Sequence, residues 1–381
     1  MELSAEDALR LNVLLANELH AVRLDESAMT LHGLLARGES RVRLNPIGRD
    51  EVYLRRVREM LSSHVLGSPG GYPIYLRRWT RMGQARDDSL EKLLLLGEPE
   101  AVVAVVHAPG LTDELARRAW WSLPTADNAR TMLTRECVCR GGMGPVLAQY
   151  LIDYLPFEED PRAMIESVRL ILQPGLISDE TRARIWAKAR TKNTYFVGFL
   201  LTAPDELPEP PAAHPAWEGL ADPLRVLAAS GNAYARQTCR VLDGPGQAFL
   251  ATAEAVMRKP SNQDVMVGLL EALQGYFQAI ACTGERLQDI DAVRAQAELR
   301  CRNCPVEDEQ LTELLCQFPG LTPVVRAMLM LSAAGERLVA PIFARTDAIG
   351  TVMRRKLEPV TQPLLAEIAL LRGTTRGPVG S

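Results

Sequence analysis

Residues 101–121 read AVVAVVHAPGLTDELARRAWW and contain, in order, an apolar run, a Pro-Gly pair and a second apolar run. Glycine accepts the left-handed conformation that often ends a helix, and proline cannot continue the ladder of helical hydrogen bonds. Thr112 then offers a capping hydroxyl, and two acids follow it where the first turn of a new helix would lie. Leu111, Leu115 and Ala119 recur at helical spacing. The stretch therefore predicts two helices joined by a tight turn.

The same Pro-Gly-Leu tripeptide occurs three times, each time between apolar runs, at residues 109–111, 174–176 and 319–321. One helical hairpin cannot bury its own apolar face, so neighbouring hairpins must stack. The spacing between the copies is uneven, which favours a mainly α fold of irregular, HEAT-like stacked helical hairpins. The alternative is that Pro-Gly-Leu is only a common turn between helices.

The overall composition also favours helices. The chain has 381 residues, of which 47 % are hydrophobic and only 5 % aromatic. That content is enough for a substantial core, and the abundance of Leu and Ala favours helix over strand. The formal net charge of −4 gives no overall attraction to nucleic acid or to a membrane surface.

The ends and the cysteines predict a cytoplasmic protein. Residues 1–7, MELSAED, are acidic, whereas a secretory signal begins with positive charge and a continuous apolar stretch. No window approaches the roughly 18 uninterrupted apolar residues that a membrane-spanning helix needs. Seven cysteines, an odd number, fit reduced thiols better than a disulfide framework.

The first ninety residues differ from the rest of the chain. A helix over 5–17 and another over 50–63 flank short alternating stretches at 21–24, 29–35 and 41–44, which we interpret as small strands. The alternative is that these stretches are irregular loops. The expected organisation is a small α+β portion over 1–90, helical bodies over 91–202 and 224–372, a Pro-rich linker over 203–223 and a disordered tail over 373–381.

Positive charge is concentrated near the N-terminus. Ten arginines and three acids lie between Arg41 and Arg86, a local charge of +7 in a chain whose total is −4. Arginines interleaved with aromatic rings suit single-stranded nucleic acid, and arginines also pair with acidic proteins or with acids of their own chain. Because the whole chain is not basic, a protein-docking or intramolecular role is favoured over RNA binding. The candidate interaction patch comprises Arg55, Arg56, Arg58, Tyr72, Tyr75, Arg77, Arg78, Trp79 and Arg81.

Two cysteine pairs are candidates for thiol chemistry. Cys301 and Cys304 form a Cys-x-x-Cys, and Cys137 and Cys139 are one residue closer together. A Cys-x-x-Cys can hold a reactive thiolate or supply two metal ligands, but a closed metal site usually needs four, and a redox motif usually stands beside a βαβ unit. We therefore treat Cys301 and Cys304 as candidate redox thiols and predict no metal or other cofactor. The alternative is that the cysteines only pack in the core.

No established catalytic pattern is present. The five histidines show no paired spacing, and no serine lies in a nucleophile elbow. The glycine clusters at 67–71 and 141–144 lack the strand and the Gly-Lys-Ser/Thr ending of a phosphate-binding loop, so we interpret them as turns. We identify no catalytic residue, and the pattern favours a protein that is not an enzyme.

Several long tracts resemble one family. They are LSAEDALRLNVLLAN at 3–17, VLGSPGGYPIYLRRWTRMGQ at 65–84, the stretch from Leu96 to Leu133 and KPSNQDVM at 259–266. These tracts are similar to the DsrS proteins, which are encoded with the dissimilatory sulfite reductase system of sulfur-oxidising bacteria. The resemblance implies a soluble cytoplasmic accessory protein for the oxidation of stored sulfur, not a reductase subunit. The tracts contain no catalytic motif, so the resemblance assigns no active-site residue.

We therefore expect a non-enzymatic accessory or regulatory scaffold with a protein partner in the sulfur-oxidation system. One alternative is a thiol-based sulfur or electron transfer protein that uses Cys301 and Cys304. Another alternative is an RNA-binding regulator that acts through the segment from Arg55 to Arg81.

Overall fold

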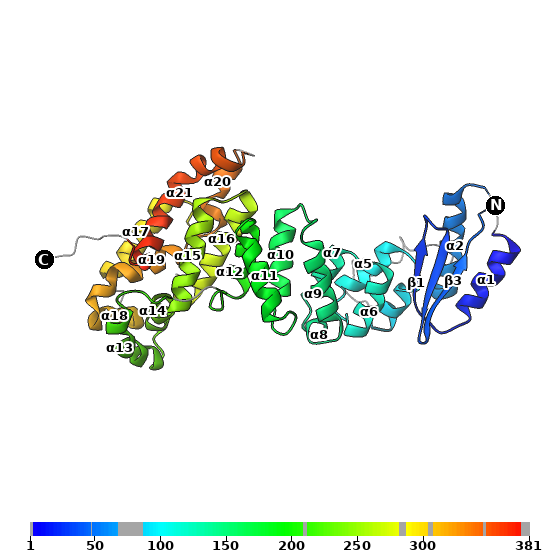
Figure 1. Cartoon of the computed structure of the whole chain (residues 1–381), viewed down its shortest axis with the longest axis horizontal. Helices are drawn as coiled ribbons and strands as arrows, with labels where there is room; N and C mark the ends of the chain where they lie inside the picture. Colours follow the sequence, from blue (N-terminus) through cyan, green and yellow to red (C-terminus); the bar gives the residue numbers. More distant parts are fainter. Residues whose placement is uncertain are drawn as a thin grey trace. The chain divides into compact units, whose positions relative to one another are not determined.

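A computed structural model describes residues 3–46, 48–67, 87–208, 212–281, 287–303, 308–345 and 348–374 (Figure 1). The fold is mainly α with a three-stranded antiparallel sheet near the N-terminus, which confirms the predicted fold class. Backbone contacts divide the chain into two compact units. Unit 1 comprises residues 1–156 and 174–176, and unit 2 comprises residues 157–173 and 177–381.

The elements described in unit 1 are α1 (Ala5–Leu15), β1 (Leu19–Asp25), β2 (Thr30–Leu35), β3 (Gly38–Arg43), α2 (Asp50–Leu66), α4 (Asp87–Leu93), α5 (Pro99–His107), α6 (Asp113–Ser122), α7 (Ala126–Met132), α8 (Glu136–Cys139) and α9 (Met143–Tyr154). The first helices described in unit 2 are α10 (Pro161–Ile171), α11 (Asp179–Ala189), α12 (Asn193–Thr202), α13 (Trp217–Ala229), α14 (Ala233–Leu242), α15 (Gly244–Arg258) and α16 (Gln263–Tyr276). They are followed by η1 (Gln278–Ile280), α17 (Ile290–Asn303), α18 (Glu309–Gln317), η2 (Pro319–Leu321), α19 (Thr322–Ser332), η3 (Glu336–Leu338), α20 (Ala340–Phe343) and α21 (Gly350–Leu371), where η marks a 3-10 helix.

The sheet is a meander in the order β1-β2-β3, as the short alternating stretches predicted. Its face bearing Val22 and Leu31 is covered by apolar side chains of α1 and α2 in one buried cluster. Gly33 on the central strand allows α1 to approach closely. A side-chain carbon at that position would lie 2.7 Å from a methyl group of Leu19 and 3.2 Å from one of Leu14.

A buried carboxylate joins three segments of this N-terminal region. Asp7 of α1 is fully buried, and it accepts hydrogen bonds from the Tyr53 hydroxyl of α2 and from the backbone and side-chain amides of Asn45, at 2.9 and 3.1 Å. Burial alone would raise the pKa of Asp7, but the hydrogen bonds from Tyr53 and Asn45 outweigh it and hold that pKa below its ordinary value. Burial, together with the Asp7 hydrogen bond, raises the pKa of Tyr53 to about 12.

The first Pro-Gly-Leu copy joins two packed helices, as predicted. It lies between α5 and α6, which contact each other. The Thr112 hydroxyl oxygen accepts a hydrogen bond from the Leu115 backbone N–H at 3.2 Å and so caps α6. The predicted stripe of Leu111, Leu115 and Ala119 is buried.

The second and third copies differ from each other. Between α10 and α11, Gly175 takes a φ of +82°, which glycine accepts without strain. At the third copy, Pro319–Leu321 forms η2, and the helix direction turns by 113° between α18 and α19. Pro323 suits the first turn of α19, so the new helix starts directly after the 3-10 turn. After α19 the chain forms the short η3 and α20.

The centre of unit 2 is aromatic and apolar. Phe249 of α15 is fully buried and stacks on Tyr276 of α16, with 3.9 Å between the ring centres. The Arg240 guanidinium lies 3.8 Å from the Tyr276 ring centre and forms two hydrogen bonds, of 2.8 and 2.7 Å, with the Asp205 carboxylate. Arg240 therefore attaches the Pro-rich segment to the aromatic core.

The Pro-rich segment 203–223 was expected to separate two helical bodies. In the structure α12 and α16, which precede and follow it in the chain, pack against each other within unit 2. Its last part, from Trp217 onward, belongs to α13, in which Pro223 is tolerated. The division between units falls near Pro156 instead. Of the expected tail, residues 375–381 lie outside the described residues.

Candidate functional site

The structure describes one cysteine of the Cys-x-x-Cys candidate. Cys301 is 7 % exposed and belongs to the apolar core of unit 2, whereas Cys304 lies outside the described residues. Arg300, the residue before Cys301, donates to the Asp308 carboxylate at 2.6 Å and to the Tyr234 hydroxyl at 2.7 Å. A reactive thiol needs access to its substrate, so the burial of Cys301 suits packing better than exchange.

The tighter pair of cysteines lies in unit 1. The Cys137 thiol donates to the Leu111 carbonyl at 3.2 Å, and the Cys139 thiol donates to the Leu133 carbonyl at 3.0 Å. Both thiols are therefore hydrogen-bonded to the backbone of their own unit. Among the residues that the structure describes, no group of three or more His, Cys, Asp or Glu side chains could hold a metal ion.

Three members of the candidate interaction patch are described. Arg55 and Arg56 of α2 both pair with Glu59, at 3.9 and 2.6 Å, and Arg58 pairs with Glu26 of the β1–β2 turn. These arginines therefore serve acids of their own chain, which is one of the roles that the sequence left open. The other members lie outside the described residues, namely Tyr72, Tyr75, Arg77, Arg78, Trp79 and Arg81.

The glycine cluster at 141–144 is a turn that holds a carboxylate of the same chain. Asp113 accepts hydrogen bonds from the Gly142 and Met143 backbone N–H groups, at 2.9 and 3.1 Å, at the start of α9. A side-chain carbon at Gly141 would lie 2.2 Å from the Asp113 carboxyl carbon. The Asp113 carboxylate thus occupies the N–H groups at the start of α9, where a phosphate-binding loop would hold its phosphate. This agrees with the interpretation of the cluster as a turn.

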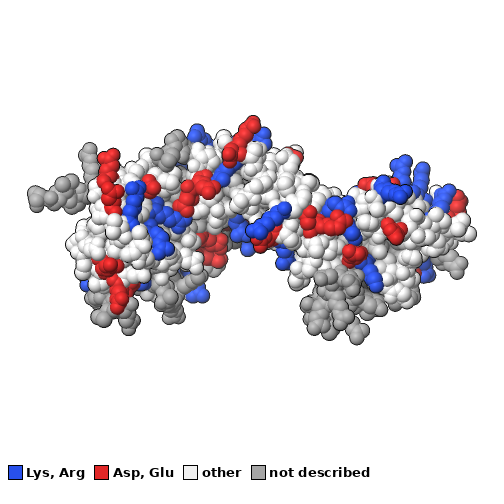
Figure 2. Space-filling view, turned by 90° about the horizontal axis from the view of Figure 1, so that it is seen from below, with Lys and Arg blue, Asp and Glu red and all other residues white. Residues whose placement is uncertain are grey.

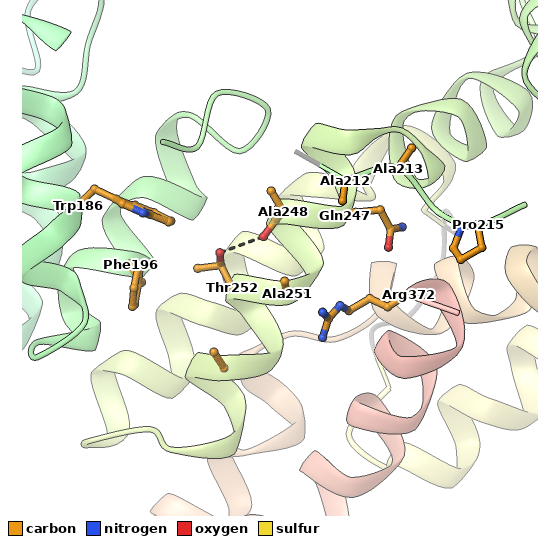
Figure 3. Close-up of a pocket in the computed structure, with 11 residues that line it drawn as sticks. Trp186, Phe196, Ala212, Ala213, Pro215, Gln247, Ala248, Ala251, Thr252 and Arg372 are labelled. Atoms are coloured by element: carbon orange, nitrogen blue, oxygen red, sulfur yellow. Dashed lines mark hydrogen bonds between the residues drawn. The ribbon is translucent and has the colours of Figure 1, made fainter. Parts of the chain in front are cut away.

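Unit 2 contains an open groove of about 480 Å³ along α15 (Figure 3). Trp186 and Phe196 lie at one end, and Pro215 and Arg372 lie at the other. Small side chains of α15 form the surface between them, namely Ala248, Ala251, Thr252 and Ala255. Their spacing of three and four residues is the sequence signal for one helix face, which the sequence analysis overlooked.

The polar groups of this groove are engaged within the protein. The Thr252 hydroxyl donates to the Ala248 carbonyl at 2.9 Å, and the buried Gln247 amide donates to the carbonyls of Val241 and Leu371. Arg372 pairs with Glu254, which also pairs with Arg258. Burial would raise the pKa of Glu254, but the two arginines outweigh it and lower that pKa. The groove therefore presents small apolar surface rather than a free acid, base or nucleophile.

Unit 1 contains a second groove, of about 460 Å³, between α1 and β3. We call it the edge groove, and its lining residues are Leu9, Arg10, Val13, Leu14, Asn17, Ser40, Arg41, Val42 and Arg43. Leu9 and Val13 are one helical turn apart on α1 and are 65 % and 61 % exposed, which is high for aliphatic side chains. Figure 1 shows α1 in dark blue beside the sheet. Arg41 and Arg43 are among the ten arginines of this region, and nothing in the local sequence indicates that their strand borders an apolar helix face.

The strand that borders the edge groove also carries two arginines without an ion pair among the described residues. Arg10 pairs with Glu6 of the same helix, whereas Arg41 and Arg43 form no ion pair within the described ranges. This differs from α2, where each described arginine of the candidate patch has an acidic partner. Figure 2 shows one face of the molecule, on which several basic and acidic side chains lie next to each other.

Comparison with models of protein families, with curated proteins and with solved structures returned no match to the chain. Among the described residues, no single helix is both long enough and apolar enough to cross a membrane.

Proposed function

We propose that this protein is a non-enzymatic, cytoplasmic accessory or regulatory scaffold that supports the oxidation of stored sulfur by the dissimilatory sulfite reductase pathway. The biological context comes from the resemblance of four sequence tracts to the DsrS family. The molecular role, docking of a protein partner, comes from the surface of unit 1. The observation that carries it is the edge groove, where exposed Leu9 and Val13 of α1 lie beside β3, whose opposite face bears the unpaired Arg41 and Arg43.

The chemistry of the other candidate sites supports contact rather than catalysis. Cys301 is buried in the core, and the thiols of Cys137 and Cys139 donate to backbone carbonyls. The groove of unit 2 has its polar groups occupied by neighbours in the same chain. In contrast, an exposed apolar strip rimmed by charge is typical of surfaces that bind other proteins.

The test is gene replacement in a sulfur-oxidising bacterium that carries this chain and stores sulfur. Deletion should slow the consumption of stored sulfur, and the wild-type gene should restore it. A Cys301→Ser, Cys304→Ser double variant should restore it equally, since the proposed role uses no thiol. Normal sulfur consumption in the deletion strain would refute the proposed function. Failure of the double variant alone, at normal protein level, would establish the thiol alternative.

A further inference from the structure

Along one edge of β3, a row of backbone hydrogen-bonding groups has no partner among the described residues. The Leu44 backbone N–H donates to the Met29 carbonyl at 2.8 Å, which fixes which residues of this antiparallel pair exchange hydrogen bonds. Such pairs alternate along a ladder, and the register pairs Val42 with Leu31 and Ser40 with Gly33. The backbone groups of Ser40 and Val42 therefore point to β2. Those of Glu39, Arg41 and Arg43 point away from it, and no strand in the described part of the chain pairs with them.

The side chains of β3 alternate in chemistry as well as in direction. Ser40 and Val42 are half-buried, and Val42 packs against the apolar cluster that includes α1. Arg41 and Arg43 point to the opposite face of the sheet and are exposed. A strand added beside β3 would follow the same alternation. Every second side chain would contact Leu9 and Val13, and the side chains between them would lie beside the two arginines.

We propose that the edge groove binds an extended segment of a partner protein as a fourth strand, and that this segment alternates apolar and acidic residues. This inference rests on the proposed docking function and names the chemistry of its partner. Backbone hydrogen bonds to Glu39, Arg41 and Arg43 hold the segment along β3, as in other cases of strand addition. Its apolar side chains cover Leu9 and Val13, and its acidic side chains pair with Arg41 and Arg43.

Charge distinguishes this occupant from segments of the same chain. Residues 68–86 contain four arginines and no acid, and residues 375–381 contain one arginine and no acid. Either segment would bring positive charge to the edge strand that already carries Arg41 and Arg43. In an antiparallel pairing of two copies centred on Arg41, that arginine would face its own counterpart, and like charges directly opposite destabilise a pair.

Charges on an edge strand also guard against uncontrolled pairing, so the arginines alone would not indicate a ligand. The second observation is the exposed pair Leu9 and Val13 on the helix that borders the strand. A purely protective edge gains nothing from aliphatic groups in the groove beside it. Glu39 shares the face of Arg41 and Arg43, but its carboxylate accepts a hydrogen bond from the Trp121 indole N–H. Within the described residues, an unpaired ladder edge, two arginines without an ion pair and an apolar wall together favour a strand with two chemically different faces.

The experiment uses the full-length protein and a fluorescein-labelled peptide in which valine and glutamate alternate over the length of β3. Fluorescence anisotropy should show saturable binding that weakens between about 50 and 300 mM salt. A peptide with lysine in place of glutamate should bind at least about tenfold more weakly, since each exposed ion pair adds a modest factor and the pairs act together. A peptide with proline at its central position should also bind weakly, because it lacks a backbone donor.

Three variants test the separate contacts. Arg41→Glu with Arg43→Glu should lose binding of the glutamate peptide and gain binding of the lysine peptide. Leu9→Asp with Val13→Asp should weaken binding of both peptides, and these exposed positions leave the core intact. Arg41→Pro removes one outward donor without breaking a bond to β2 and should also weaken binding. The matched control is Arg55→Glu with Arg56→Glu on α2, which should bind like the wild type.

Equal binding of both charged peptides, or no saturable binding by the wild-type protein, would overturn the inference. A concentration-dependent dimer that Arg41→Pro disrupts would assign the edge to a second copy and would overturn it as well. Neither result changes the deletion phenotype in cells, so failure of this inference is distinguishable from failure of the proposed function. If the deletion strain consumes stored sulfur normally while the peptide binds as expected, the strand-binding inference stands and the proposed role in sulfur oxidation is refuted.

Discussion

The N-terminal sheet region of unit 1 and the helical core of unit 2 both bury an apolar cluster, but they differ in the groups that hold their elements in place. In the sheet region, α1, α2 and the segment after β3 converge on one buried carboxylate, Asp7, whose partners are all polar. In unit 2 the centre is an aromatic stack of Phe249 and Tyr276 with Arg240 on its rim. Hydrogen bonds fix position and direction, whereas apolar burial supplies free energy with little directional demand. The polar contacts of Asp7 therefore fix the position of α1, which forms one wall of the edge groove.

The largest expected effect comes from the aromatic core. Phe249→Ala should lower the free energy of unfolding of unit 2 by about 3–5 kcal/mol, since it removes a fully buried ring and leaves a cavity. Hydrogen exchange read by mass spectrometry should show faster exchange in α15 and α16 with little change in β1–β3. Tyr276→Phe is the matched control and should cost only about 1 kcal/mol, because it keeps the ring and loses one hydrogen bond. An equal increase of hydrogen exchange in both units of Phe249→Ala would contradict the separate stabilisation of the sheet region and the helical core.

The next effect concerns the buried carboxylate. Asp7→Asn should destabilise the sheet region by about 2–4 kcal/mol, because the amide replaces an acceptor by a donor opposite groups that themselves donate. Exchange should rise in α1, α2 and β3 while α15 stays protected. Tyr53→Phe, which removes one donor, should cost less.

The wild type and Asp7→Asn should differ in how their free energy of unfolding depends on pH. The folded-state pKa of Asp7 lies below its ordinary value of 3.8, so the carboxylate stabilises the fold above about pH 4. That contribution is lost as the pH falls through the folded-state pKa. Denaturant titrations followed by exchange at pH 7 and at about pH 3 should show this loss for the sheet region of the wild type. Asp7→Asn lacks a titrating group at that position, so an unchanged acid dependence in this variant would assign the effect to other carboxylates.

The smallest effect is expected on the surface of α2. Arg56→Ala removes an exposed pair with Glu59 and should change the free energy of unfolding by less than about 0.5 kcal/mol. Chemical denaturation with and without salt measures it. A loss above 1 kcal/mol would show that these surface pairs contribute to the sheet region as strongly as its buried network.

Local signals in the sequence predicted many of the elements. The three strands, the hairpin of α5 and α6, and the cap at Thr112 all follow from residues close together in the chain. The third Pro-Gly-Leu copy was expected to resemble the first, but Pro323 lies directly behind it and starts α19 without a connecting loop. The tripeptide alone could not show this, because the outcome depends on the residue that follows.

The candidate sites were harder to predict, because they depend on contacts between distant residues. Asp113 binds the turn at Gly142, and nothing near either residue indicates that pairing. The edge groove requires α1 to lie beside β3, so that Leu9 approaches Arg41 only after folding. The cysteine pattern could be recognised at once, yet the burial of Cys301 depends on how α17 packs.

The missing side chain of Gly33 has a consequence for recognition. A side-chain carbon there would meet methyl groups of Leu19 on β1 and of Leu14 on α1, so the empty position lets both side chains pack over the central strand. A methyl group would force these two side chains to shift, and Leu14 is one of the residues that line the edge groove. The shape of the binding surface is therefore coupled to a residue that does not line it.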